Sequence, residues 1–288
     1  MTMRYLVLNG SPHRGNTWKL VDLACVNIRR EDPQAAFEEI HLAQENLPFC
    51  LGCSACFRLG QRKCPHGGTV GRIMEAIGRA DGIIIASSTY NRRETALLKN
   101  LFDHLSFLLH RPHFFRGKAL VITTGGVGAA QAAKSISSFL LGIGFNRCHR
   151  FSASAYSWND YRVGEKTAAK LAKVCTRFQR DVASGRLHSP SGLVLIPYNL
   201  FRGMSLAYGP GSEYETEDGI HWTARGAAGA CMTAPSPCPS TSVPSASSSM
   251  CWARSPEEML WSPTRSSACK FSEIVMLFIE VLPKVSKG

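Results

Sequence analysis

The chain has 288 residues, 44% of them hydrophobic, which is enough to bury one substantial core with length to spare. One α/β domain with extensions is therefore favoured over two full domains. The formal net charge of +12 comes from scattered basic pairs, not from a tract. No helix-turn-helix or zinc-finger spacing accompanies these pairs, so the composition argues against a nucleic-acid partner.

The first ten residues, MTMRYLVLNG, form a short apolar run and a turn, and they lack the long apolar region of a signal peptide. The late apolar run over 274–279 is too short to span a bilayer. We therefore expect a cytoplasmic protein with no membrane partner. Because disulfides rarely persist in that compartment, the eleven cysteines point to metal or redox use.

Strand and helix patterns alternate from residue 4 to residue 186. Short apolar runs predict strands over 5–8, 82–87 and 119–123, and the segments 36–42 and 148–155 can form two further strands. Apolar residues at helical spacing predict helices over 17–30, 70–77, 97–108, 129–141 and 168–182. This alternation predicts a doubly wound, five-stranded parallel sheet with helices on both faces. Ligands bind such sheets outside the carboxyl ends of the strands, so the turns after the first, third and fourth strands are the candidate site.

The first of these turns, over 10–17, has the sequence GSPHRGNT and leads directly into a helix. Small residues let the backbone approach an anion, and a helix N-terminus offers free N–H groups. The spacing Gly10-x4-Gly15 is similar to a Walker A loop, but Asn16 stands where that loop has lysine, so a monophosphate group is favoured over a triphosphate. The alternative is a simple N-capped helix with Thr17 as its cap.

The same turn resembles the GSPRxGNT signature of the NADPH-dependent FMN reductase family, with His13 in place of the usual arginine. The resemblance continues through 80–84, Tyr90, 98–103 and 123–128. It implies a flavodoxin-like fold in which the first turn holds the FMN phosphate. The second turn, where Ser88 replaces the family's proline, would lie beside the flavin ring.

The resemblance and the turn positions together give a set of candidate FMN-binding residues: Ser11, Pro12, His13, Gly15, Asn16, Thr17, Ser88, Thr89, Tyr90, Asn91, Thr124, Gly125, Gly126 and Gly128. A tyrosine face is a good platform for a flat aromatic ring, and a glycine-rich turn permits close approach of the backbone. The alternatives are that Tyr90 packs at the entry of the following helix and that the glycines form a flexible turn.

Four cysteines, Cys50, Cys53, Cys56 and Cys64, follow the second strand with the spacing C-x2-C-x2-C-x7-C. The first three have the tight spacing of ferredoxin cluster ligands. Iron–sulfur flavoproteins carry a compact motif of this kind in the same place, and this resemblance implies a [4Fe–4S] cluster. Zinc with His66 as a substitute ligand, redox-active C-x-x-C pairs, and a loop of reduced cysteines without metal are the alternatives.

These features predict an FMN-dependent oxidoreductase that passes electrons from NAD(P)H or a reduced protein to a small acceptor or a partner protein, with a 4Fe–4S cluster as a further carrier. The flavin performs the chemistry, so no catalytic side chain is expected. A non-enzymatic flavin- or metal-dependent redox sensor is the alternative. We also expect a homo-oligomer.

Three regions are expected along the chain. Residues 1–189 would form the flavodoxin-like domain, with a cysteine-rich insertion over 43–68. Residues 190–225 would be an irregular extension that covers the flavin or a dimer partner. Residues 226–288 are rich in Ser and Pro and are expected to be either a disordered extension or a frameshifted ending that contributes nothing to flavin binding.

Overall fold

The computed structural model describes residues 2–156 and 161–225, so the Ser/Pro-rich region over 226–288 lies outside the described residues. Its centre is a five-stranded sheet in the order β2-β1-β3-β4-β5, and every neighbouring pair is parallel. The strands are β1 (Arg4–Asn9), β2 (Ala36–His41), β3 (Gly82–Ser88), β4 (Lys118–Gly125) and β5 (Arg147–Ser154). This strand order confirms the predicted flavodoxin-like doubly wound fold.

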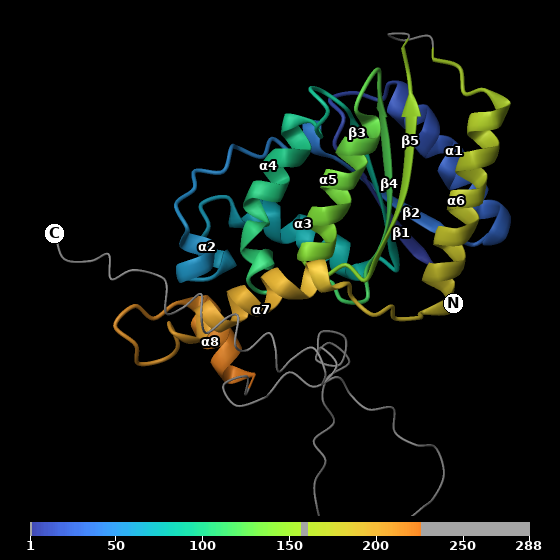
Figure 1. The fold of residues 1–288 in the computed structure, drawn as a ribbon. Helices are drawn as coiled ribbons and strands as arrows, with labels where there is room; N and C mark the ends of the chain where they lie inside the picture. Colours follow the sequence, from blue (N-terminus) through green and yellow to red (C-terminus); the bar gives the residue numbers. More distant parts are fainter. Residues whose placement is uncertain (1, 157–160, 226–288) are drawn as a thin grey trace, which may run out of the picture.

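Helices cover both faces of the sheet (Figure 1). Helices α1 (Asn16–Glu31) and α6 (Glu165–Ser184) pack on one face, and α3 (Gly67–Arg79), α4 (Ala96–His104) and α5 (Ala129–Gly142) pack on the other. Strands β1, β3 and β4 are buried between these two layers. Burial on both sides explains why they are continuous apolar runs in the sequence.

The predicted helix over 97–108 is interrupted. Helix α4 ends at His104, and the chain continues as the 3₁₀ turn η3 (Ser106–Leu109). The Ser106 hydroxyl donates a 2.6 Å hydrogen bond to the Asp103 carbonyl. Such a local side-chain bond competes with continuation of the helix.

The connection after β2 contains the cysteines and has little regular structure. It consists of η1 (Leu42–Gln44), the single-turn helix α2 (Ala55–Arg58) and η2 (Gln61–Lys63). Ser54, Gly52 and Gly60 have positive φ angles of 56°, 64° and 94°, so the backbone leaves the helical and extended conformations at each of them. We call residues 47–66 the cysteine loop.

The extension after α6 contains two helices, α7 (Gly192–Leu206) and α8 (Glu217–Ala224), joined by irregular chain. The Thr216 hydroxyl caps α8 by accepting the N–H of Gly219, and acidic residues at the start of α8 suit its positive dipole end. Both helices lie below α4 and α5 in Figure 1. Trp222 of α8 and Tyr198 of α7 pack with Phe115 in a small apolar cluster. That this extension covers the flavin or a dimer partner stays a prediction.

Among the helices of the described ranges, none combines the length and apolar character needed to cross a membrane.

Candidate functional site

Three turns meet at the carboxyl edge of the sheet because β3 lies between β1 and β4. The Ser11 hydroxyl accepts hydrogen bonds from the Ser88 N–H (2.9 Å) and the Ser88 hydroxyl (3.0 Å). The Thr17 hydroxyl lies 2.5 Å from that of Thr124 and 3.3 Å from that of Ser88. Four predicted residues, one or more from each turn, therefore form a single hydroxyl cluster.

The first turn leaves the start of α1 open. Gly15 occupies the N-cap position and no side chain caps the helix. Thr17 is the second residue of the helix and is almost fully buried, and its hydroxyl bonds across to the other turns, so the alternative that Thr17 caps α1 is wrong. Pro12 and His13 are exposed on the outside of the turn. An uncapped helix N-terminus beside buried hydroxyls fits a phosphate group.

Arg14 supplies positive charge beside this turn. Its guanidinium lies 4.5 Å from the centre of the Trp18 ring and pairs with Glu39 at 2.5 Å. Both partners come from the elements that flank the turn, α1 and β2. The Arg14 guanidinium is therefore held at the edge of the first turn, where it can bind an anion in addition to Glu39.

The second turn is backbone-strained. Asn91 and Arg92 have φ angles of 49° and 63°, in the left-handed region that few arginines adopt. A Cβ atom on Gly128, itself at φ 88°, would lie 2.5 Å from Arg92 Cγ, so only glycine fits there. The two turns are thus interlocked. Tyr90 is 52% exposed, so its ring is available to stack on a ligand.

The third turn lies against the second. The Thr89 N–H donates a 2.8 Å hydrogen bond to the Thr124 carbonyl, and a Cβ on Gly125 would lie 2.8 Å from Thr89 Cβ. The Thr89 hydroxyl is buried and has no hydrogen-bond partner within the described residues. A buried unpaired hydroxyl favours a polar ligand, so the residues present fit FMN. Gly126 lies near the exposed ring of Tyr156.

Two site residues had not been predicted. The Thr95 hydroxyl donates to the Gly10 carbonyl and accepts the Leu98 N–H, which ties the first turn to the start of α4. Its position just before an apolar helical run is an N-cap signal that could have found it. Glu94 is 9% exposed, and its Oε2 has no partner in residues 2–156 and 161–225. No signal in the sequence marks Glu94.

The four predicted metal ligands, Cys50, Cys53, Cys56 and Cys64, line one cavity of about 60 Å³. Burial raises the pKa of the Cys56 thiol, and the neighbouring Cys64 and Cys50 raise it further. The cavity brings the predicted set together, and four thiols are a suitable donor set for an iron–sulfur cluster or zinc. Within the described part of the chain, however, no three His, Cys, Asp or Glu side chains converge closely enough to hold a metal ion.

Helix α4 holds the start of the cysteine loop. The Asn100 amide accepts the Cys50 N–H at 3.0 Å and donates to the carbonyls of Leu47 and Pro48 at 3.1 Å each. His104 Nε2 lies 2.9 Å from the same Pro48 carbonyl, and its Nδ1 lies 4.0 Å from Cys64 Sγ. One helix therefore joins the first turn at its start and the cysteine loop farther along.

The other described cysteines lie away from the loop. Burial raises the pKa of the thiols of Cys25, Cys148 and Cys175 to about 12. Such thiols are inert at neutral pH and pack as small apolar side chains.

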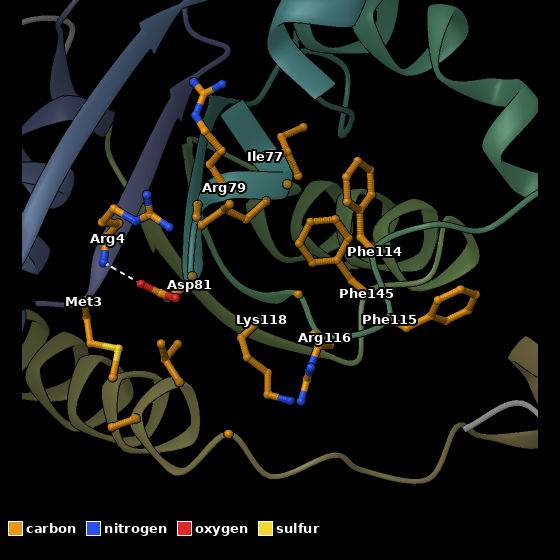
Figure 2. Close-up of a pocket in the computed structure, with 18 of the residues that line it drawn as sticks. Met3, Arg4, Ile77, Arg79, Asp81, Phe114, Phe115, Arg116, Lys118 and Phe145 are labelled. Atoms are coloured by element: carbon orange, nitrogen blue, oxygen red, sulfur yellow. Dashed lines mark hydrogen bonds between the residues drawn. The ribbon is translucent and has the colours of Figure 1, made fainter. Parts of the chain in front are cut away.

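A cavity of about 630 Å³ lies at the opposite edge of the sheet, where the strands begin (Figure 2). Lys118 borders it, and its ammonium donates to Asn146 Oδ1 and the Arg186 carbonyl, each at 2.6 Å. Burial lowers the pKa of Lys118. This lysine ties the end of the α6 region to the sheet, and no predicted site residue lines the cavity.

Residues 3–158 match the NADPH-dependent FMN reductase family. An iron–sulfur flavoprotein of Clostridioides difficile is 29% identical over 174 residues, which are 60% of this chain and 76% of that protein. An iron–sulfur flavoprotein of Archaeoglobus fulgidus is 31% identical over 144 residues, which are 49% of this chain and 69% of that protein.

Solved structures similar to this chain include an NADH:FMN oxidoreductase in its apo form, with 23% identity, a TM-score of 0.47, and coverage of 62% of this chain and 89% of that one. The NAD(P)H:quinone oxidoreductase of Methanothermobacter marburgensis has 19% identity, a TM-score of 0.47, and coverage of 65% and 100%. The family match spans the whole sheet and its three turns. The chain belongs to the NADPH-dependent FMN reductase family, in its iron–sulfur flavoprotein branch, and is an NAD(P)H-dependent FMN oxidoreductase.

Proposed function

We propose that the three interlocked turns form the FMN site. The observation that carries this proposal is the hydroxyl cluster of Ser11, Thr17, Ser88 and Thr124 beside the uncapped start of α1. Backbone N–H groups of the first turn and these hydroxyls would bind the phosphate. Pro12, His13, Gly15 and Asn16 belong to this phosphate turn. The remaining members of the other two turns would lie beside the flavin ring: Thr89, Tyr90, Asn91, Gly125, Gly126 and Gly128.

FMN supplies hydride and electron transfer chemistry when it is bound. The protein binds the FMN, orients its ring and shields the ring from solvent. Gly125 and Gly128 let the third turn pack against Thr89 and Arg92, and a Cβ on Gly126 would meet no atom nearer than 3.8 Å, so an extended ring can approach the backbone there. The exposed Tyr90 ring offers one stacking face and leaves the outer side open to NAD(P)H and then to an acceptor. That acceptor is a small molecule or a redox protein.

The four cysteines of the cavity are proposed as ligands of a [4Fe–4S] cluster that relays electrons to or from FMN. Their shared cavity supports this assignment, as do two relatives named as iron–sulfur flavoproteins. The seven cysteines of the described residues are all free, so the four thiols of the cavity are available as ligands. Zinc, redox-active thiols and a metal-free loop are distinguished by the experiment below.

A homo-oligomer is also proposed, because α7 exposes a row of apolar side chains at helical spacing: Leu193, Ile196, Leu200 and Met204. Contiguous exposed apolar surface is typical of protein interfaces.

Anaerobic purification of the wild type and of Cys53→Ser tests the function. The wild type should show the two flavin bands, contain iron and sulfide, and oxidise NAD(P)H. Cys53→Ser should lose iron and sulfide yet keep FMN, because Cys53 belongs to the cavity and not to the turns. Cys148→Ser is the control, since its hydroxyl can still bond the Ser137 carbonyl that Cys148 Sγ contacts at 3.9 Å.

Each other outcome excludes part of the proposal. Zinc without iron would replace the cluster with a structural metal, and the absence of any metal would leave thiols alone. FMN binding without NAD(P)H turnover would favour the redox sensor. Failure to bind FMN at high micromolar concentration would refute the assignment of the three turns.

A further inference from the structure

Buried charged side chains join the C-terminal helix α8 to the cysteine loop. Asp218 of α8 is 5% exposed, and its carboxylate lies between two residues that follow η3. Its Oδ2 lies 2.8 Å from His110 Nδ1, and its Oδ1 lies 2.7 Å from Arg111 Nε, an ion pair without hydrogen-bond alignment. The other side of the guanidinium reaches the cysteine loop, where Arg111 Nη2 donates a 2.6 Å hydrogen bond to the Cys56 carbonyl.

The side chain of His110 extends this connection by packing. Its ring stacks on Phe201 of α7 with a centroid distance of 4.3 Å, and it meets the edge of Phe57 in α2 at 4.8 Å. The indole N–H of Trp222 in α8 donates a 3.0 Å hydrogen bond to the His110 carbonyl. Helices α2, α7 and α8 are thus gathered around one histidine.

Helix α2 depends on these contacts. It has four residues, none fully buried, and it starts after Ser54 in the left-handed conformation. So short a helix is not stable by itself. The Arg111 hydrogen bond and the ring of His110 hold it in place, and Arg111 is in turn stabilised by Asp218. An arginine whose side chain is 9% exposed has a high desolvation cost without a carboxylate beside it.

We propose that Asp218 and Arg111 are positioning residues of the cysteine centre. Through the Cys56 carbonyl they fix α2, and with it the thiols of Cys53 and Cys56 that flank its start. The extension after α6 is then a structural part of that centre and not only a cover for another site. The inference rests on the proposed ligand role of these cysteines.

Asp218→Asn tests this inference in the full-length, FMN-loaded protein. The amide removes the charge that balances Arg111, so α2 should open more often. The rate of iodoacetamide modification at Cys56, read by peptide mass spectrometry under native conditions, should rise at least about tenfold, which corresponds to about 1.4 kcal/mol of local stability. Modification of Cys148 should keep its wild-type rate. Iron and sulfide per FMN should fall in the same samples.

Glu217→Gln is the matched control. It makes the same charge change one residue earlier on α8, but Glu217 is 40% exposed and lies 3.4 Å from Arg111 Nη1. Exposed pairs contribute little, so the Cys56 rate should stay within about twofold of wild type. Arg111→Lys is the second variant, since an ammonium keeps the charge opposite Asp218 but cannot also reach the Cys56 carbonyl as the planar guanidinium does. It should accelerate modification of Cys56 even if Asp218→Asn fails to fold.

Unchanged Cys56 rates in folded Asp218→Asn, or in Arg111→Lys, would overturn the inference. Equal acceleration at Cys56 and Cys148 would also overturn it, because that result indicates general loss of stability. A wild type without metal would refute the cluster but not the positioning role, which the modification rates measure separately.

Discussion

The flavin turns and the cysteine loop are built in different ways. The turns extend directly from β1, β3 and β4, whose parallel ladders fix where each turn begins. The cysteine loop has one four-residue helix and one short 3₁₀ turn. It is held by side chains from α4, from the segment after η3 and, through Arg111, from α8. The sheet holds the flavin turns rigid, whereas the cysteine loop must be held by side chains that are distant in the sequence.

This difference means that the two sites can be disabled separately. A change in the hydroxyl cluster should remove FMN and leave the cysteine loop in place. A change in the anchors of the loop should release the metal and leave FMN bound. The first two predictions below test that separation, and the third concerns the stability of α8.

Thr17→Asp should have the largest effect. It places a carboxylate among the hydroxyls of Thr124 and Ser88, where the phosphate would bind. Two unit charges 4 Å apart repel by about 4 kcal/mol at an effective dielectric constant of about 20, so FMN affinity should fall at least about 100-fold. Titration by quenching of FMN fluorescence measures this loss. Thr17→Ser keeps the hydroxyl and should bind normally, and an unchanged Kd for the aspartate variant would place the phosphate elsewhere.

Asn100→Asp should have an intermediate effect, confined to the other site. The carboxylate can still accept the Cys50 N–H but cannot donate to the carbonyls of Leu47 and Pro48. Leaving these groups unpaired costs about 1–3 kcal/mol, so metal content should fall while the Kd for FMN stays within about threefold. Metal analysis and the same titration measure the two effects. Lys99→Gln, an exposed change on α4 that shifts the charge by the same amount outside the cysteine cavity, is the control. Equal loss of FMN and metal would show that the two sites are not independently held.

The smallest effect concerns pH and α8. Burial, followed by the charges of Arg225 and Arg111, lowers the pKa of His221 from 6.5 to about 4. Between these values the unfolded chain binds a proton that the folded chain does not, so stability is lost as the pH falls through this window. At pH 5 the free energy of unfolding should be lower by about 1 kcal/mol, which is about half of what the pKa shift alone would give, because the ring is partly exposed. This loss corresponds to ~2–4 °C in Tm.

Thermal melts at pH 7 and pH 5 measure this effect, and His221→Gln should reduce the difference between them. An equal decrease in Tm for wild type and variant would assign the pH dependence to other groups, such as His149, whose pKa is also lowered by burial.

Much of the fold could be predicted because its signals are local. Apolar runs marked β1, β3 and β4, and helical spacing marked α1, α3, α5 and α6. The more polar strands β2 and β5 were also predicted, as plausible strands in the alternating pattern. The break after His104 was missed because it depends on one serine hydroxyl bonding back to the chain. Helices α7 and α8 were expected as irregular chain, since their stability comes from packing around Phe115 and Trp222 and not from a strong local pattern.

The flavin site could be anticipated in the same way, because parallel topology requires the turns after β1, β3 and β4 to share one edge. The hydroxyl cluster and the left-handed Arg92 that locks onto Gly128 were not visible in the sequence. Each depends on the distance between turns that are far apart along the chain. The role of each residue toward FMN stays a prediction.

The sequence by itself determined the alternation of strands and helices, the edge that carries the turns, the resemblance to the family and the four cysteines as a group. These follow from periodicity, turn composition and short motifs, which act over a few residues, whereas the strand order was read from the structure. Only the tertiary structure decided what holds the cysteine loop, because Arg111 and Asp218 are more than a hundred residues apart and have no common motif. Their pairing follows from burial, since a charge removed from water must find its partner wherever the fold brings one.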